Sequence, residues 1–233
     1  MVLMTSMAAL ADLAEEQGGL FTRRQAETTG MAWSTLSHLS SEAAIVERVA
    51  HGVYRMRGAP APEHLELRAA WLQLSPGTPA WERRPADGVV SHRSAAALYG
   101  FGHLPADIHE FTLPRRRQSR RPDLRLHRGH LTETEWTSLN GLLVTRPQRI
   151  VSDLLSARED PGAVGQVLAE ALRDGHSHPA AMARSLSGYA ARLGLRRGDG
   201  VALLRWLLEL ATAPERNHWL SQIPDTETST APP

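Results

Sequence analysis

Apolar residues in the first 57 positions recur at the spacing of helical faces, and each such run ends at a glycine or a polar turn. A first helix, ending near Gly18-Gly19, is predicted by the apolar positions Leu3, Met7, Leu10, Leu13 and Ala14. A second, short helix is predicted over Thr22–Thr29, because the Thr22 hydroxyl can accept from the first free amides of a helix and Gly30 can end it. The chain therefore begins with two helices of unequal length.

The next stretch predicts a third helix followed at once by a two-stranded ribbon. The segment Trp33–Leu39 carries two leucines toward a core and leaves its polar side chains outward. Strands are predicted over Ile45–Val49 and Val53–Met56, joined by the turn Ala50-His51-Gly52, whose glycine can supply a positive φ. Two short helices, a turn and a β-ribbon make a winged helix-turn-helix, a module that can place its second helix in the major groove of DNA.

The remainder of the chain alternates at first between helix and strand and is then helical. Helices are predicted around Leu65–Leu72 and over His92–Tyr99, with Ser91 as the cap of the latter, and strands over Ile108–Leu113, Leu124–His127 and Leu142–Thr145. Thr145 is expected to open a further helix that runs to Leu155, and amphipathic helices are predicted over Val164–Leu172, Pro179–Leu193 and Val201–Leu210.

These patterns predict an α+β protein of several parts: an N-terminal winged helix-turn-helix, a mixed α/β second domain with a small sheet, and C-terminal helices. The expected boundaries are a DNA-binding domain over residues 1–57, a proline-stiffened linker over 58–62, a mixed domain over 63–157, a helical segment over 158–213 and a disordered tail over 214–233.

Composition narrows the class of protein further. The chain has 233 residues, 42% of them hydrophobic, which is enough for two modest cores. It contains no cysteine, so disulfides and thiolate metal sites are excluded and a cytoplasmic location is favoured. We find neither a signal peptide nor an apolar run long enough to span a membrane, so no membrane partner is expected.

Positive charge is concentrated in one segment, although the net charge of the chain is only +1 and every basic residue is arginine. Seven arginines lie within fourteen positions against one acid, Asp123, and give a local charge of +6. They are Arg115, Arg116, Arg117, Arg120, Arg121, Arg125 and Arg128. We interpret the segment as an Arg-rich hairpin that either contacts phosphates or faces a protein partner, while the ordinary alternative is a solvated loop between two strands.

The N-terminal unit supplies the candidate contacts to DNA. Ser34, Thr35, Ser37 and His38 are expected to reach bases or phosphates from the second helix of the motif, Arg23 and Arg24 to hold the backbone from the preceding helix, and Arg48 and His51 to serve the wing. Residues 1–58 nevertheless carry a net charge of −1, so their affinity for DNA alone should be weak. A winged helix used for protein contact is the competing interpretation.

Catalytic motifs are missing from the sequence. We find no Gly-x-Ser-x-Gly, P-loop, Gly-x-Gly-x-x-Gly or His-Glu-x-x-His pattern, so the protein is not expected to be an enzyme. His176 and His178 lie in a predicted loop without a third ligand, and His92 is interpreted as a cap or core residue. Neither a metal nor another cofactor is expected.

Two stretches of the chain, spanning about residues 5–157, match a known family. The segments Gly19–Ala26, Trp33–Leu39 and His51–Arg55 resemble the N-terminal winged helix of AbiEi-family antitoxins. The segments Val90–Gly100 and Val144–Leu154, with the Arg-rich hairpin between them, are similar to the domain that follows it in that family.

The resemblance implies the antitoxin of a bacterial type IV toxin–antitoxin pair. Such a protein represses its own operon through the winged helix, so double-stranded DNA of its own operator is one implied partner. The other is a nucleotidyltransferase-type toxin, which is opposed directly or indirectly.

Two other functions compete with this one. The first is a stand-alone winged-helix transcriptional regulator that has no toxin partner. The second is a nuclease, because related chains continue into a restriction-endonuclease-like domain; this chain lacks the lysines and paired acids of such a domain, so the nuclease is set aside.

Overall fold

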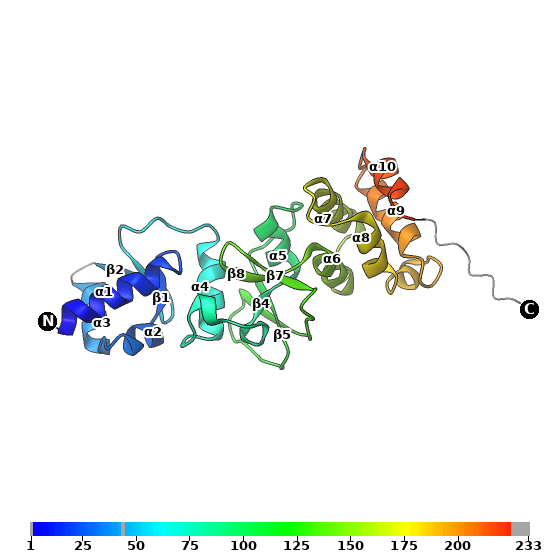
Figure 1. Ribbon diagram of the computed structural model, residues 1–233. Helices are drawn as coiled ribbons and strands as arrows, with labels where there is room; N and C mark the ends of the chain where they lie inside the picture. The colour runs from blue at the N-terminus through cyan, green and yellow to red at the C-terminus, as the bar shows by residue number, and fades with distance from the viewer. Residues whose placement is uncertain (1, 43–44, 225–233) are drawn as a thin grey trace, which may run out of the picture. The chain divides into compact units, whose positions relative to one another are not determined.

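The computed structural model describes residues 2–42 and 45–224 and confirms the α+β fold class (Figure 1). The N-terminal part contains three helices and three short strands: α1 (Val2–Glu15), β1 (Leu20–Thr22), α2 (Arg23–Thr28), α3 (Trp33–Ser41), β2 (Val46–Ala50) and β3 (Val53–Met56). The strands form an antiparallel sheet in the order β1-β3-β2, so the predicted ribbon of β2 and β3 gains a third strand. This part is a winged helix-turn-helix.

A compact core holds the winged helix together. Leu10 of α1, Phe21 of β1 and Leu36 of α3 are fully buried in one cluster, and the rings of Phe21 and Tyr54 stack at 5.8 Å across the β1–β3 pair. Burying apolar side chains from all three helices and the sheet, Ala26 being the one from α2, holds α3 by its inner face. The opposite face of α3 therefore stays available.

Helix α4 (Leu65–Leu74) follows the linker and packs on the winged-helix sheet, and it also contacts strand β5 of the second sheet. Two 3-10 turns, η1 (Ala80–Glu82) and η2 (Pro85–Asp87), come after it. Between these turns, Arg83 folds back into the core, only 6% exposed, and donates hydrogen bonds to carbonyls at the C-terminal end of α4. Such carbonyls have no partner within a helix, so Arg83 serves as its C-terminal cap.

The second sheet is mixed and has the order β6-β5-β4-β8-β7. Its strands are β4 (Val89–Val90), β5 (His109–Leu113), β6 (Leu124–Arg128), β7 (Trp136–Leu139) and β8 (Leu142–Thr145), and helix α5 (His92–Tyr99) follows β4 (Figure 1). The two-residue β4 and the half-buried β7 escape prediction, because neither presents the run of apolar or alternating residues that marks a strand.

The prediction of an Arg-rich hairpin is wrong, because β5 and β6 are parallel neighbours and a hairpin joins antiparallel strands. His109 is paired with Leu124 and Leu113 with Arg128, so the chain must return the whole length of β5 before β6 begins. Residues 114–123 make this return, and we call them the Arg-rich crossover. In a hairpin, by contrast, a short turn would have joined adjacent ends of the two strands.

The C-terminal part is helical, with α6 (Pro147–Ser156), α7 (Pro161–Arg173), α8 (Pro179–Leu186), the 3-10 turn η3 (Ala190–Leu193), α9 (Gly200–Leu210) and α10 (Arg216–Ser221). Helix α9 packs closely on α7 and α8: a Cβ at Gly165 would collide with a carbonyl of α9, and one at Gly200 with a carbonyl of α8. Among the described residues, no helix is both long and apolar enough to cross a bilayer.

Three details of this part differ from the sequence prediction. The predicted Pro179–Leu193 helix ends at Leu186, two residues before Gly188, because glycine is a poor helix former. Thr145 ends β8, and α6 begins two residues later at a proline that suits a first turn. The disorder expected from residue 214 is wrong for α10, because Trp219 is buried there; residues 225–233 of that predicted tail lie outside the described residues.

Contacts divide the chain into two compact units. The first holds the residues up to Ser94 together with Ala106–Thr145, and the second holds Ala95–Pro105 with the described residues from Arg146 onward. The boundaries expected after residues 57, 62 and 157 are not those of this division. The physical reason is packing: α4 contacts both the winged helix and β5, and α6 packs on α7 and α8.

Candidate nucleic-acid interface

A capping box fixes the first helix of the motif. The Thr22 side chain accepts from the Gln25 amide at 3.1 Å, and the Gln25 side chain accepts from the Thr22 amide at 2.8 Å. Each group satisfies a donor that the start of a helix leaves unpaired. Gly30, at φ +83°, then takes the left-handed conformation that turns the chain into α3. The predicted cap and stop are both confirmed.

Helix α3 presents a polar face. Ser34, Ser37 and His38 are exposed and Thr35 is half-buried, whereas Leu36 points into the core. His38 Nδ1 lies 2.8 Å from a carboxylate oxygen of Glu42 one turn later. The four predicted residues thus share the side of α3 that the core leaves free, with hydroxyl and imidazole groups that can donate or accept hydrogen bonds.

The wing is the β2–β3 ribbon, and it carries two of the predicted residues. Arg48 and His51 are both exposed, and the Arg48 guanidinium lies 3.0 Å from His51 Nδ1. A register shift between Arg48 and Ala50 and a positive φ of 70° at Gly52 turn the ribbon at this point. The structure therefore brings the two wing residues together.

The two arginines of α2 differ in their surroundings. Arg23 forms an ion pair with Glu27 at 2.8 Å, and its guanidinium stacks over the Trp33 ring at 4.3 Å. It links α2 to α3 and has less freedom to reach a phosphate than its neighbour. Arg24 is exposed on the same helix.

The Arg-rich crossover lies against the end of α4, within the first unit. Arg117 donates to the Leu74 carbonyl at 2.6 Å, and Arg121 is held by Asp123 and by the side chain of Gln73. The hydrogen bond and charge of Asp123 raise the pKa of Arg121, and Arg121 in turn lowers the pKa of Asp123. The C-terminal end of α4 also carries the negative end of the helix dipole, which favours the positive charge of these arginines at this position.

At the end of α4, residues of the crossover and of the winged helix line one cavity. Arg117 and Arg121 line a cavity together with Arg23 and Arg24 of α2 and His51 of the wing. In the sequence these groups are more than sixty residues apart. The exposed residues Arg115, Arg116 and Arg120 belong to the same crossover but do not line the cavity.

The last two arginines of the basic segment lie on β6 and face opposite sides of the sheet. Arg125 faces the side of Glu110 on β5, 3.4 Å from its carboxylate, whereas Arg128 faces the side of the leucines of β6. In the sequence both belong to the one basic segment, which was expected to contact phosphates or to face a protein partner. Strand alternation separates them, and Glu110 already partners Arg125.

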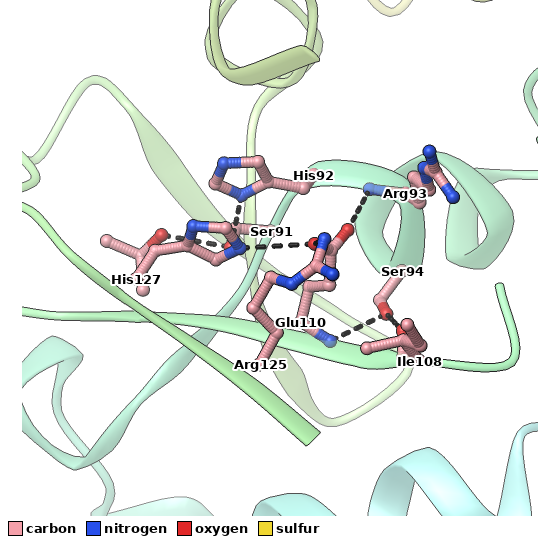
Figure 2. A network of polar contacts seen from close by, with 9 residues as sticks. Ser91, His92, Arg93, Ser94, Ile108, Glu110, Arg125 and His127 are labelled. Carbon is pink, nitrogen blue, oxygen red and sulfur yellow. Dashed lines mark hydrogen bonds and ion pairs between the residues drawn. The ribbon is translucent and has the colours of Figure 1, made fainter. Parts of the chain in front are cut away.

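Figure 2 shows a polar cluster that the sequence analysis missed, around the buried Glu110. The Glu110 carboxylate lies 3.1 Å from His127 Nε2 and accepts from the Arg93 amide at 3.1 Å, and the His127 ring stacks on His92 at 3.6 Å. The side chain of Ser94 accepts from the Glu110 amide at 2.9 Å. The alternation of polar and apolar residues along β6 is the one signal that places His127 on this face.

The pKa of Glu110 lies below its usual value. Burial by itself raises this pKa, but the hydrogen bonds from His127 and from the Arg93 amide, with the charges of His92 and His127, outweigh it. The carboxylate is therefore ionised in the folded protein at neutral pH.

A lowered pKa in the folded state makes stability depend on pH. The ionised Glu110 contributes stability that is fully present above its unfolded pKa, near 4.5, and is lost as the pH falls through the lower folded value. We expect the difference in unfolding free energy between the wild type and Glu110→Gln to shrink as the pH is lowered from 6 to below about 4. Denaturant titrations at several pH values measure it. A difference that stays constant would contradict the role given to this carboxylate.

The predicted loop histidines have structural partners. His178 accepts from the Ala180 amide at 3.2 Å as the cap of α8, and His176 packs edge-on against Tyr99 and Phe101. Within the part of the chain that the structure describes, no three His, Cys, Asp or Glu side chains are grouped as a metal site.

An exposed polar helix beside a two-stranded wing defines the winged helix-turn-helix class. Within that class, residues 8–57 match the family AbiEi_4, described as "Transcriptional regulator, AbiEi antitoxin". The match includes α2, α3 and the wing, and it confirms the resemblance to AbiEi antitoxins over those residues. A comparison with curated proteins gave no match.

Proposed function

We propose that this protein is an antitoxin and a transcriptional repressor of its own operon, acting in the cytoplasm without catalysis. The observation that carries the proposal is the exposed polar face of α3 beside the wing, in the segment that matches a family of regulators and antitoxins. A helix of this kind, fixed on its inner side by a core, can enter the major groove of an operator.

The proposed contacts follow from exposure. From α3, base edges or phosphates are contacted by the exposed Ser34, Ser37 and His38. The half-buried Thr35 adds a contact at the edge of the same polar face. Arg24 contacts the DNA backbone beside them, while Arg23 orients Trp33 and α3. Arg48 and His51 contact the backbone from the wing.

The Arg-rich crossover belongs to the same interface in this proposal. The sequence alone left two partners possible for the basic segment, namely phosphates or a toxin. The place of Arg117 and Arg121 in one cavity lining with Arg24 and His51 favours phosphate, since these arginines add cations to the weakly charged winged helix. The exposed Arg115, Arg116 and Arg120 add to that surface.

Changing Arg115, Arg116 and Arg117 together to alanine should weaken operator binding and reduce its salt dependence. Each lost phosphate contact lowers the slope of log Kd against log salt by about 0.9, so the three give up to about 2.7. Gel shifts at several salt concentrations measure this slope.

The matched control changes Arg192, Arg196 and Arg197 to alanine, three exposed arginines of the second unit, for the same loss of charge. An unchanged slope in the crossover variant, or an equal change in the control, would assign the crossover to another partner.

The antitoxin half of the proposal is tested by co-expression. We expect the protein to restore growth to bacteria that express a nucleotidyltransferase-type toxin encoded beside it. Rescue should persist in variants that no longer bind the operator, if repression and antitoxicity are separate activities. Binding to its own promoter without rescue would instead make the protein a stand-alone regulator, which is the alternative function.

A further inference from the structure

The cavity beneath the Arg-rich crossover has the features of a ligand site. Its volume is about 500 Å³, within the range of about 300–1,000 Å³ that small-molecule sites occupy. It is lined by three parts of the first unit: the start of α2 with the wing turn, the end of α4, and the crossover with β6. Neither the winged helix nor the sheet alone would form it.

The lining combines apolar and cationic residues. Val53, Leu74, Leu124 and Leu126 are its apolar members, and Arg23, Arg24, Arg117 and Arg121 are its basic ones. Among the described residues that line the cavity, none is aspartate or glutamate. Apolar side chains favour a flat ring, and guanidinium groups favour a phosphate or carboxylate.

Two of these arginines are held in place before any ligand arrives. Asp123 and Gln73 position Arg121, and the Leu74 carbonyl positions Arg117. A guanidinium has five N–H donors, so each retains donors for a ligand after these bonds are made. Little side-chain entropy is then lost on binding, which favours affinity.

We propose that this cavity binds a small aromatic anion, either a nucleoside monophosphate or an aromatic carboxylate, with its ring on the leucines and its charge on Arg117 and Arg121. The ligand also regulates the protein: Arg24 and His51 line the same cavity, so a bound anion withdraws them from DNA and weakens operator binding. This second step rests on the proposed function, whereas binding of the anion does not.

Calorimetric titration of the full chain tests binding directly, with AMP, GMP and benzoate as probes and with adenosine and inorganic phosphate as partial ligands. We expect saturable one-to-one binding of at least one probe, with both partial ligands weaker by about tenfold or more, since each lacks one half of the recognised chemistry. AMP or GMP binding identifies the nucleotide class, and benzoate binding alone identifies the carboxylate class.

Variants locate the site. Arg117→Gln and Leu126→Glu should each weaken binding by about tenfold or more, the first by losing a charged donor and the second by placing a carboxylate in the lining. Arg197→Gln is the matched control, an exposed arginine of the second unit that does not line the cavity, and should bind the anion as the wild type does. Thermal melts confirm that each variant is folded.

The inference is overturned if no probe binds saturably in the millimolar range, or if Arg197→Gln weakens binding as much as Arg117→Gln. A gel shift with the upstream DNA, run with and without the bound probe, separates the two proposals. Operator binding without anion binding refutes the cavity site alone, and anion binding without operator binding refutes the repressor function alone.

Discussion

Replacing Arg83 by alanine is expected to destabilise the first unit by about 3 kcal/mol or more. This guanidinium donates to the Leu72 carbonyl at 2.8 Å and the Ser75 carbonyl at 2.7 Å, also bonds the Trp71 carbonyl, and stacks over the Trp71 ring at 4.3 Å. Burial lowers the pKa of Arg83 to about 10, and Asp87 opposes that shift, so the group stays charged at neutral pH. Its loss would leave buried carbonyls unpaired at the end of α4.

Thermal and denaturant unfolding measure the effect, with Arg115→Ala as a control because that arginine is exposed. A loss of about 3 kcal/mol lowers the melting temperature of a domain of this size by about 10 °C. Arg83→Lys should recover only part of the loss, since a single ammonium cannot reproduce the planar fork that serves several carbonyls. Equal melting of Arg83→Ala and Arg115→Ala would show that α4 needs no such cap.

Changing Ser37 to glutamate is expected to reduce operator affinity by about 100-fold, or about 2.7 kcal/mol. The side chain is exposed on the polar face of α3, so the charge would meet phosphates and base acceptors when the helix enters the groove. Glutamate is a good helix former, so α3 itself should persist. Titration of labelled upstream DNA measures the affinity.

Ser138→Glu is the matched control, since it places the same charge on an exposed serine of β7 in the second sheet. It should bind the operator nearly as the wild type does. If both variants bind alike, α3 is not the helix that contacts DNA, and the proposed function loses the observation that carries it.

The winged helix was predictable because its determinants are local. The capping box at Thr22, the glycine after α2 and the turn at Gly52 act within a few residues, and the apolar position of Leu36 follows from helical spacing. Missing from the prediction was β1, a strand of three residues that exists only because it pairs with β3. Strand pairing of that kind leaves almost no local pattern.

The candidate site was predictable in part. The residues of α3 and the wing lie on faces that the core leaves free, as their polarity indicates. The Arg-rich segment was recognised by its charge but misread in shape, because charge says nothing about strand direction. Arg83 and Glu110 escaped notice, since a buried charged residue looks the same in sequence as an exposed one.

The amino-acid sequence by itself determined the α+β class, the winged helix and the one strongly basic segment, because caps, turns, periodicity and charge density are properties of neighbouring residues. Only the tertiary structure decided that β5 and β6 run parallel, and that the crossover between them meets α2 and the wing around one cavity. The physical reason is that these contacts join groups far apart in the sequence, through the pairing of β5 with β6 and a hydrogen bond from Arg117 to a carbonyl 43 positions earlier, and no local pattern encodes such partners.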